Sequence, residues 1–363
     1  MYFENELKAL KKANRYREIE QFDSDIVDLA SNDYLGLASK KSQLKKAFDL
    51  TNKYKTIAPK ASLLVNGYHD IHKSFEDKIA NVNGFEAGQI VGSGFLANIS
   101  LIETLVRRGD ELFIDSEYHA SGIMASNLIK DVTVFKHNSA EDLEDKLKQS
   151  RAKRKVIAIE GVYSMSGDIA KKELFELASK YDVLLIVDEA HSSGTIGKNL
   201  LGVFDYYDLK IEPNFIKMGT LGKAYGSYGA YILCSSKIKD FLVNRAKPII
   251  YSTAPSVIDT ALALVNLEYI LQKAPKLYIK LENRRKLVKE CLNIEINSQI
   301  VPILQPSNIE AKKRQKALLQ SGYLVGAIRQ PTVEMPIIRL IPRVGVKLKE
   351  LKKALKLLKS LND

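Results

Sequence analysis

The sequence contains no tryptophan and only two cysteines, Cys234 and Cys291. Two cysteines that lie far apart in the chain build neither a disulfide framework nor a cysteine metal cluster, so both are expected to be structural thiols and no metal site is predicted. No stretch reaches about 18 uninterrupted apolar residues, and the first residues, MYFENELKALKKANRYREIEQ, lack the apolar segment of a signal peptide. These absences predict a cytoplasmic protein without a membrane span.

Positive charge exceeds negative charge, with 55 Lys and Arg against 43 Asp and Glu and a formal net charge of +12. Such an excess suits an anionic partner, either a nucleic acid or a small molecule such as a phosphorylated cofactor or coenzyme A. The lysines are scattered along the whole chain, and aromatic residues do not alternate with them as they do on surfaces that stack on bases. The pattern therefore favours solvated helix faces and predicts no nucleic-acid partner.

From about residue 70, short runs of Val, Ile, Leu and Phe alternate with segments of helical periodicity. This alternation is typical of buried, mostly parallel strands joined by crossover helices. It predicts an α/β domain with a seven-stranded sheet, formed by the runs QIVGSG, ELFIDS, VTVFKH, KVIAIEGVYS, VLLIVDEAH, NFIKMGT and YGAYILCSS.

The pattern changes after Tyr251, where a long helical stretch leads past Ala274-Pro275 into a second predicted helix. Strands around QIVPILQ, YLVGAIR and PIIRLIP then alternate with helices, which predicts a small α+β domain. At 363 residues the chain is long enough for two unequal domains. We predict a helix and an extended arm over residues 1–40, a large domain over 41–274 and a small domain over 275–363.

Polar residues that directly follow a buried strand are informative, because open α/β sheets bind ligands at the carboxyl ends of their strands. In VLLIVDEAH, Asp188 follows a nearly continuous apolar run, so its carboxylate is expected in a partly desolvated place that calls for a cationic partner. A protonated pyridine nitrogen is such a partner, and His191 can reach the same ligand. The alternative is an Asp that caps the following turn and a His bonded to the backbone.

The segment MGTLGKAYGSYGA places Lys223 in a glycine-rich turn after another predicted strand. Glycines let the backbone approach a ligand closely, and a lysine in such a turn either clamps a phosphate or forms an imine. The spacing does not match the Walker pattern, which argues against a nucleotide-hydrolysing enzyme. A second small-residue turn, GSGFLANIS, runs into a helix whose first N–H groups can hold a phosphate, although the same sequence also suits an ordinary sharp turn.

Taken in order, seven motifs between about residues 26 and 345 resemble one family, the α-oxoamine synthases, which are enzymes of fold type I that use pyridoxal 5′-phosphate (PLP). The motifs are SNDYLGLA, the Ser-Gly-Phe turn, YHAS, EGVYSMSGD, VDEAHSSGTIG, MGTLGKAYGSYGA and YST. The resemblance implies the fold of PLP-dependent transferases, PLP as the cofactor, and a homodimer with shared active sites.

The resemblance also implies a role for each matching residue. Lys223 would hold PLP as a Schiff base, with Asp188 at the ring nitrogen and His191 at the ring 3′ oxygen. His119 would stack on the ring and complete the catalytic set. The implied cofactor-binding residues are Ser93, Gly94, Phe95, His119, Ser164, Asp188, His191, Thr220, Lys223, Ser252 and Thr253.

Two further groups of residues are assigned by the resemblance. Ser252 and Thr253 would reach the phosphate bound by the neighbouring subunit, which makes a homodimer the working unit. Asn32 and Arg339 match positions that contact substrate, with Arg339 as the carboxylate clamp, because a guanidinium pairs bidentately with a carboxylate. His119 as a core histidine and Arg339 in a surface ion pair are the alternatives when either residue is taken alone.

Within the family, TLGKAYGSYGAYI looks most similar to members that condense L-alanine with a pimeloyl thioester in biotin biosynthesis, with release of carbon dioxide. Members that join glycine to acetyl-CoA are the nearest rivals, and the thioester carrier, coenzyme A or an acyl carrier protein, stays open. The chain departs from the usual pattern near the substrate positions, and these departures put the acyl chain in question: Leu63, Ser166, Ser192, Ser193 and the PRVG that follows Arg339. A basic binding protein that keeps the fold without the reaction is the alternative of a different class.

Overall fold

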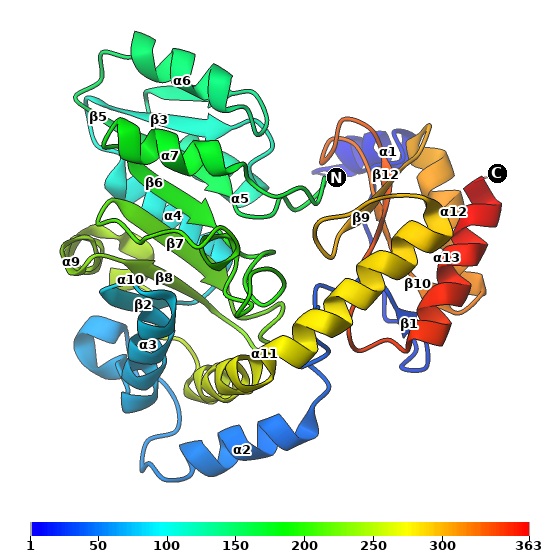
Figure 1. Ribbon diagram of the computed structural model, residues 1–363, viewed down its shortest axis with the longest axis horizontal. Helices are drawn as coiled ribbons and strands as arrows, with labels where there is room; N and C mark the ends of the chain where they lie inside the picture. The colour runs from blue at the N-terminus through cyan, green and yellow to red at the C-terminus, as the bar shows by residue number, and fades with distance from the viewer. Residues whose placement is uncertain (1, 363) are drawn as a thin grey trace. The chain divides into compact units, whose positions relative to one another are not determined.

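The computed structural model describes residues 2–362, and its backbone falls into two compact units. The larger unit comprises Leu35–Ser164 and Asp168–Ile279, and the smaller one comprises Met1–Tyr34, Met165–Gly167 and Lys280–Asp363. The larger unit contains a seven-stranded sheet (Figure 1). Its strands are β2 (Ala87–Val91), β3 (Asp110–Asp115), β4 (Val132–Phe135), β5 (Arg154–Glu160), β6 (Leu184–Asp188), β7 (Phe215–Thr220) and β8 (Ala230–Cys234).

The strand order in this sheet is β2-β8-β7-β6-β5-β3-β4. β8 runs antiparallel to both of its neighbours, and the pairs from β7 across to β4 are parallel. Each of the seven predicted apolar runs forms one strand of the sheet. The predicted mostly parallel α/β fold is therefore confirmed. Because β3, β5, β6 and β7 point the same way, the residues that follow them gather at one edge.

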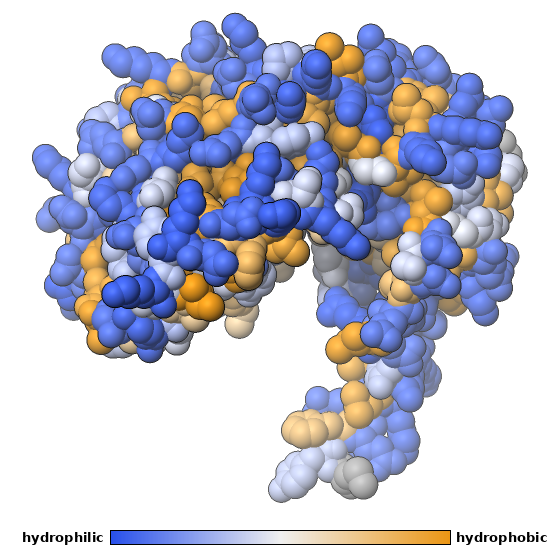
Figure 2. Space-filling view, turned by 90° about the horizontal axis from the view of Figure 1, so that it is seen from below, coloured by the Kyte–Doolittle hydropathy of each residue, from blue (hydrophilic) through white to orange (hydrophobic). Residues whose placement is uncertain are grey.

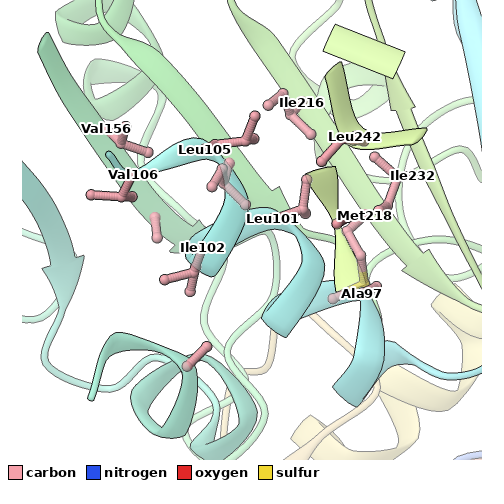
Figure 3. Packing of buried hydrophobic residues seen from close by; sticks show 14 of the residues in the cluster. Ala97, Leu101, Ile102, Leu105, Val106, Val156, Ile216, Met218, Ile232 and Leu242 are labelled. Carbon is pink, nitrogen blue, oxygen red and sulfur yellow. The ribbon is translucent and has the colours of Figure 1, made fainter. Parts of the chain in front are cut away.

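Helices cover both faces of the sheet, with α7 in front of it and α4 behind it in Figure 1. The face behind carries a continuous apolar core in which Ala97 and Leu101 of α4 lie against Met218 and Ile232 of the sheet (Figure 3). The helices of this unit are α2 (Lys41–Thr51), α3 (Asp70–Asn83), α4 (Gly94–Leu105), α5 (Ala120–Ser126), α6 (Ala140–Gln149), α7 (Lys172–Lys180), α8 (Val203–Tyr206), α9 (Ser236–Arg245) and α10 (Lys247–Ile250), with a π-helical turn η1 (Leu63–Gly67).

The smaller unit contains an antiparallel sheet in the order β11-β12-β9 and a short parallel pair of β1 with β10. Its strands are β1 (Val27–Asp28), β9 (Val301–Leu304), β10 (Tyr323–Leu324), β11 (Gly326–Ile328) and β12 (Ile337–Leu340), and its helices are α1 (Glu4–Lys12), α12 (Asn308–Gln320) and α13 (Leu348–Asn362). Apolar residues one turn apart on α13, Leu351 and Leu355, pack with Ile338 and Leu340 in the core of this unit. This is the predicted α+β arrangement.

One element differs from the sequence prediction. The helix α11 (Val257–Leu292) continues through Pro275, where a second helix was expected to begin. A proline inside a helix removes one backbone hydrogen bond and costs about 3 kcal/mol. Buried side chains on either side of it, Ala274, Leu277 and Leu281, offset that cost by packing, which a reading of local propensity does not include.

Within residues 2–362, no helix combines the length and the apolarity that crossing a membrane requires. The view in Figure 2 shows hydrophilic residues over much of the face, interrupted by apolar groups. This largely hydrophilic face agrees with the charged residues scattered along the sequence.

Candidate active site

Three acidic or hydroxyl residues end adjacent strands of the large sheet. Glu160 ends β5, Asp188 ends β6 and Thr220 ends β7. The strand register pairs Glu160 directly with Asp188. Both carboxylates are nearly inaccessible, with 1% and 3% of their surfaces exposed. The carboxyl edge of the sheet therefore concentrates buried polar groups in the way that a ligand site requires.

Lys223 and His191 meet at this edge. The Nζ atom of Lys223, in the turn after β7, lies 2.7 Å from Nε2 of His191, which follows β6. The two residues are 32 positions apart in the chain, and parallel strands bring their turns together. A lysine amine and an imidazole at hydrogen-bond distance are able to exchange or share a proton.

Asp188 is held by two donors on its two oxygens. The backbone N–H of Ala190 donates to Oδ1 at 2.9 Å, and the side-chain amide of Asn98 in α4 donates to Oδ2 at 2.9 Å. Together the two bonds set the plane of the carboxylate. Asp188 is therefore fixed in orientation, and it is the acid that the sequence predicts opposite a pyridinium nitrogen.

His119 caps the beginning of α5, with its Nδ1 accepting from the backbone N–H of Ser121 at 3.2 Å. Burial lowers the pKa of His119, the negative charge of Asp188 opposes that shift, and the positive charge of Lys223 adds to it. These influences place His119 within electrostatic reach of Asp188 and Lys223. The imidazole is thus a neutral ring at neutral pH, suited to stacking.

The Ser-Gly-Phe turn lies beside Thr220. A Cβ added to Gly94 would meet only the Cβ of Thr220, at 3.8 Å, so the glycine leaves open space between the two segments. Ser93 caps α4 by accepting the N–H of Leu96, while the first N–H groups of this helix have no helical acceptor. A helix start of this kind, next to a hydroxyl, is suited to an anion such as phosphate.

Glu160 is the second acid of the site. Its Oε2 accepts the N–H of Ser164 at 3.0 Å, whereas Oε1 has no hydrogen-bond partner among the described residues. Burial raises the pKa of Glu160 well above its usual range, and the charge of Asp188 raises it further, although Lys223 opposes the shift. Glu160 therefore holds its proton more tightly than an exposed glutamate does, and its hydrogen bond keeps the predicted Ser164 in place.

The remaining predicted residues have contacts within their own units. Thr253 forms an isolated antiparallel bridge with Ser62 and is exposed, and Ser252 beside it is partly buried. In the smaller unit, Arg339 of β12 donates from Nη1 to Oδ1 of Asn32 at 3.0 Å and is 6% exposed. Arg339 therefore does not lie in a surface ion pair, and its clamp role stays a prediction.

The departures from the family pattern have local partners. Ser192 donates to the buried Glu189, and Ser193 accepts from Tyr231 at 2.9 Å. Leu63 begins η1 and packs against the main core. In PRVG, Arg343 pairs with the carboxylates of Asp28 and Asp33, both within the smaller unit. The contacts of these residues lie within their own units. They explain why these side chains are present without invoking a bound substrate.

The sequence reasoning assigned no role to Asn98, Ser121 or Glu160. Asn98 is a polar residue in the largely apolar helix GFLANISLIETL, and a buried amide requires hydrogen-bond partners. This pattern is the signal that could have identified it. Ser121 belongs to the motif YHAS, and Glu160 ends a predicted strand. The polar character of Asn98 and Glu160 was visible in the sequence, but their contact with Asp188 depends on strand order.

His137 belongs to a second cluster of charged side chains. Its Nδ1 lies 3.0 Å from Asp115 and its Nε2 lies 3.0 Å from Asp168. Burial alone would lower the pKa of His137, but the hydrogen bonds to the two carboxylates raise it to about 10. His137 thereby links Asp115, at the end of β3, to Asp168, which follows Ser164 in the chain.

We expect His137→Gln to lower the free energy of unfolding by about 2 kcal/mol near pH 6, because the two carboxylates lose their cation. A raised pKa adds stability that is complete below the unfolded value near 6.5 and is lost as the pH rises towards 10. Urea unfolding of both proteins between pH 6 and 10 measures the difference. Lys180→Gln, which removes an exposed partner of Glu144, is the control, and a difference that stays constant with pH contradicts the prediction.

The fold and the site define a class of protein. The sequence pattern of the family described as "Aminotransferase class I and II" matches residues 24–358. A serine palmitoyltransferase from Sphingomonas wittichii has the same fold, with a TM-score of 0.90 and 23% identity, over 99% of this chain and 97% of its own. The chain therefore belongs to the aminotransferase class I and II family.

Other similar proteins carry the name of one specific enzyme. A curated "8-amino-7-oxononanoate synthase" from Helicobacter pylori is 44% identical over 341 residues, which are 93% of this chain and 91% of the relative. A solved 8-amino-7-oxononanoate synthase from Francisella tularensis is 27% identical, with a TM-score of 0.76, over 93% of this chain and 98% of its own. These relatives agree with the resemblance to α-oxoamine synthases that the motifs indicate.

Proposed function

We propose that this chain is an 8-amino-7-oxononanoate synthase, a PLP-dependent C-acyltransferase that condenses L-alanine with a pimeloyl thioester. The observation that carries the proposal is the 2.7 Å approach of the Lys223 amine to His191 at the strand edge that also holds Asp188. The 44% identity to the Helicobacter pylori relative supports the particular reaction. The relatives confirm the predictions that the chain is a PLP-dependent acyltransferase and that PLP is its cofactor.

The residues of the larger unit fit the chemical parts of PLP. Lys223 supplies the amine for the aldehyde, Asp188 supplies a buried anion for the ring nitrogen, and the space between Gly94 and Thr220 beside a helix start suits the phosphate. When bound, PLP supplies an electron sink for negative charge that develops at the α-carbon of the amino acid.

Each residue then has one task in the proposed reaction. With PLP bound, Asp188 would hold a proton at the ring nitrogen and His191 would donate to the ring oxygen. The free amine of Lys223 would accept the proton of the α-carbon. His119 would stack on the ring, and Arg339 would bind the substrate carboxylate, which is the role predicted from the sequence.

Substrate identity is tested by the thiol released from defined pairs of reactants. L-alanine and glycine are each supplied with acetyl, pimeloyl and longer-chain thioesters of coenzyme A, and pimeloyl acyl carrier protein is included as a second carrier. The expected result is the highest kcat/KM for L-alanine with a pimeloyl group. A preference for glycine with acetyl-CoA would instead identify the chain as a glycine C-acetyltransferase. A colourless protein that retains DNA binding at moderate salt would support the basic binding protein.

The proposed working unit is a homodimer with shared active sites. Thr253 and Ser62 bring two segments side by side, and apolar residues on these segments are exposed: Tyr251 by 79%, Val65 by 75% and Leu64 by 52%. Exposed apolar side chains grouped in this way are typical of a surface that a second copy covers. We further propose the cytoplasm as the location.

Co-expression of two inactive variants tests whether Thr253 serves the neighbouring subunit. Thr253→Glu places a negative charge against the phosphate, and Lys223→Ala removes the attachment point. In a mixed dimer one site carries both defects and the other carries neither, so we expect recovery of about a quarter of the wild-type activity. Lys223→Ala co-expressed with Asp188→Ala leaves both sites defective and is the control. Absence of recovery in the first pair would place Thr253 in the site of its own chain.

A further inference from the structure

Asn98 is a buried amide that touches two parts of the proposed site at once. It lies in α4, one residue after Ala97 of the main core, and is 1% exposed. Its Nδ2 atom lies 2.9 Å from Oδ2 of Asp188 and 2.8 Å from Oγ of Ser121. Its Oδ1 accepts from the hydroxyl of Tyr118 at 2.8 Å. Both hydrogens and the oxygen of the amide thus have partners.

The chemistry of these partners determines which way the amide faces. An ionised carboxylate only accepts hydrogen bonds, so the nitrogen of Asn98 must face Asp188. The hydroxyl of Tyr118 then donates to the oxygen of the amide. Burial raises the pKa of Tyr118 well above its usual range, and the charge of Asp188 adds to this effect, so that donor keeps its proton at every pH at which the enzyme works.

The second amide hydrogen determines the direction of a longer chain of hydrogen bonds. Ser121 Oγ accepts from Asn98, so its own hydrogen points to Nδ1 of His119, at 2.7 Å. The backbone N–H of Ser121 also donates to that Nδ1, at 3.2 Å. With two donors on Nδ1, a neutral His119 carries its proton on Nε2. The order of the chain is Tyr118, Asn98, Ser121 and His119.

We infer that Asn98 is a positioning residue, which orients the Asp188 carboxylate directly and, through Ser121, selects the protonation pattern of the His119 ring. The inference rests on the proposed PLP-dependent function and extends it. One helix of the larger unit thereby links the acid that faces the ring nitrogen to the imidazole that stacks on the ring. A purely structural asparagine would stabilise α4 without affecting either group.

Three variants separate these roles. Asn98→Ala removes both branches, and Ser121→Ala removes only the branch to His119. Ser100→Ala is the matched control, because Ser100 is a buried residue of the same helix. Among the described residues, its hydroxyl bonds only to the backbone of Leu96, at 2.7 Å. Each holoprotein is purified, and its content of bound PLP, its thermal midpoint and its kcat and KM for the amino acid are measured.

The decisive readouts are spectroscopic. For Asn98→Ala we expect the pH midpoint of the absorbance of lysine-bound PLP to shift by about one pH unit or more, and kcat to fall about 10-fold to 100-fold with KM changed less than about threefold. Nitrogen-15 NMR of the histidines, of which the chain has only five, should show protonation of His119 at Nε2 in the wild type. In Ser121→Ala this preference for Nε2 should weaken, because only the backbone N–H of residue 121 still donates to Nδ1. In Asn98→Ala it should also weaken, because the Ser121 hydroxyl is no longer oriented by Asn98.

The outcomes distinguish the inference from the function on which it rests. If wild-type protein shows no lysine-bound PLP absorbance, the proposed function fails and takes the inference with it. If that absorbance is present but Asn98→Ala matches Ser100→Ala in pH midpoint and in the histidine spectrum, the inference alone is overturned. If Asn98→Ala does not fold, the histidine spectrum of Ser121→Ala decides whether the inference holds, because that variant loses only a hydroxyl group.

Discussion

Lys223→Ala is expected to abolish both the yellow colour of the purified protein and its turnover. In the proposed function, the amine of Lys223 would hold PLP and would also act as the base at the α-carbon of alanine. Loss of a positioned base alone costs about 10²-fold to 10⁴-fold in rate, and loss of attachment adds to it. We expect kcat to fall at least about 10³-fold.

Absorbance spectra and borohydride reduction check this prediction directly. Reduction of the wild type should fix the cofactor to the peptide that contains Lys223, as seen by mass spectrometry, and Lys223→Ala should carry nothing. The control is Lys198→Ala, which removes an exposed lysine that also follows a glycine in the same unit. Retention of a covalent cofactor in Lys223→Ala, or attachment at another lysine of the wild type, would remove the basis of the proposed function.

Asp188→Asn is expected to lose turnover while keeping most of the cofactor. The substitution preserves size, and the N–H of Ala190 can still be accepted by the amide oxygen. In the proposed function, the neutral amide would no longer stabilise a protonated ring nitrogen, and bound PLP would then be a weaker electron sink. We expect kcat to fall about 10²-fold to 10³-fold, with PLP content within about twofold of the wild type.

The measurement is steady-state kinetics together with PLP release by alkali. Asp182→Asn is the matched control, because Asp182 is exposed and has a φ of 49°, a conformation that asparagine tolerates. Unchanged kcat in Asp188→Asn would refute the role of the carboxylate. Equal losses of activity and PLP would make Asp188 a residue of cofactor binding only.

Much of the fold follows from local patterns in the chain. Each of the seven apolar runs is short, rich in branched residues and bounded by helical segments, so each was readable as one strand without knowledge of its neighbours. The polar residues at the ends of these runs were predictable as site residues for the same reason, since parallel strands bring their carboxyl ends to one edge. Local patterns fail at Pro275. Proline usually ends a helix, but packing with distant residues stabilises α11 on both sides of it.

The sequence by itself thus determined the class of fold, and it predicted the strand edge that carries the chemistry with Lys223, Asp188 and His191 as the main residues. Only the tertiary structure decided how these residues are oriented. Asn98 reaches Asp188 across 90 positions of the chain, and His137 reaches Asp168 across 31. Hydrogen bonds act over about 3 Å, so such partners are selected by the order of strands and the placement of helices, which no local pattern of residues contains.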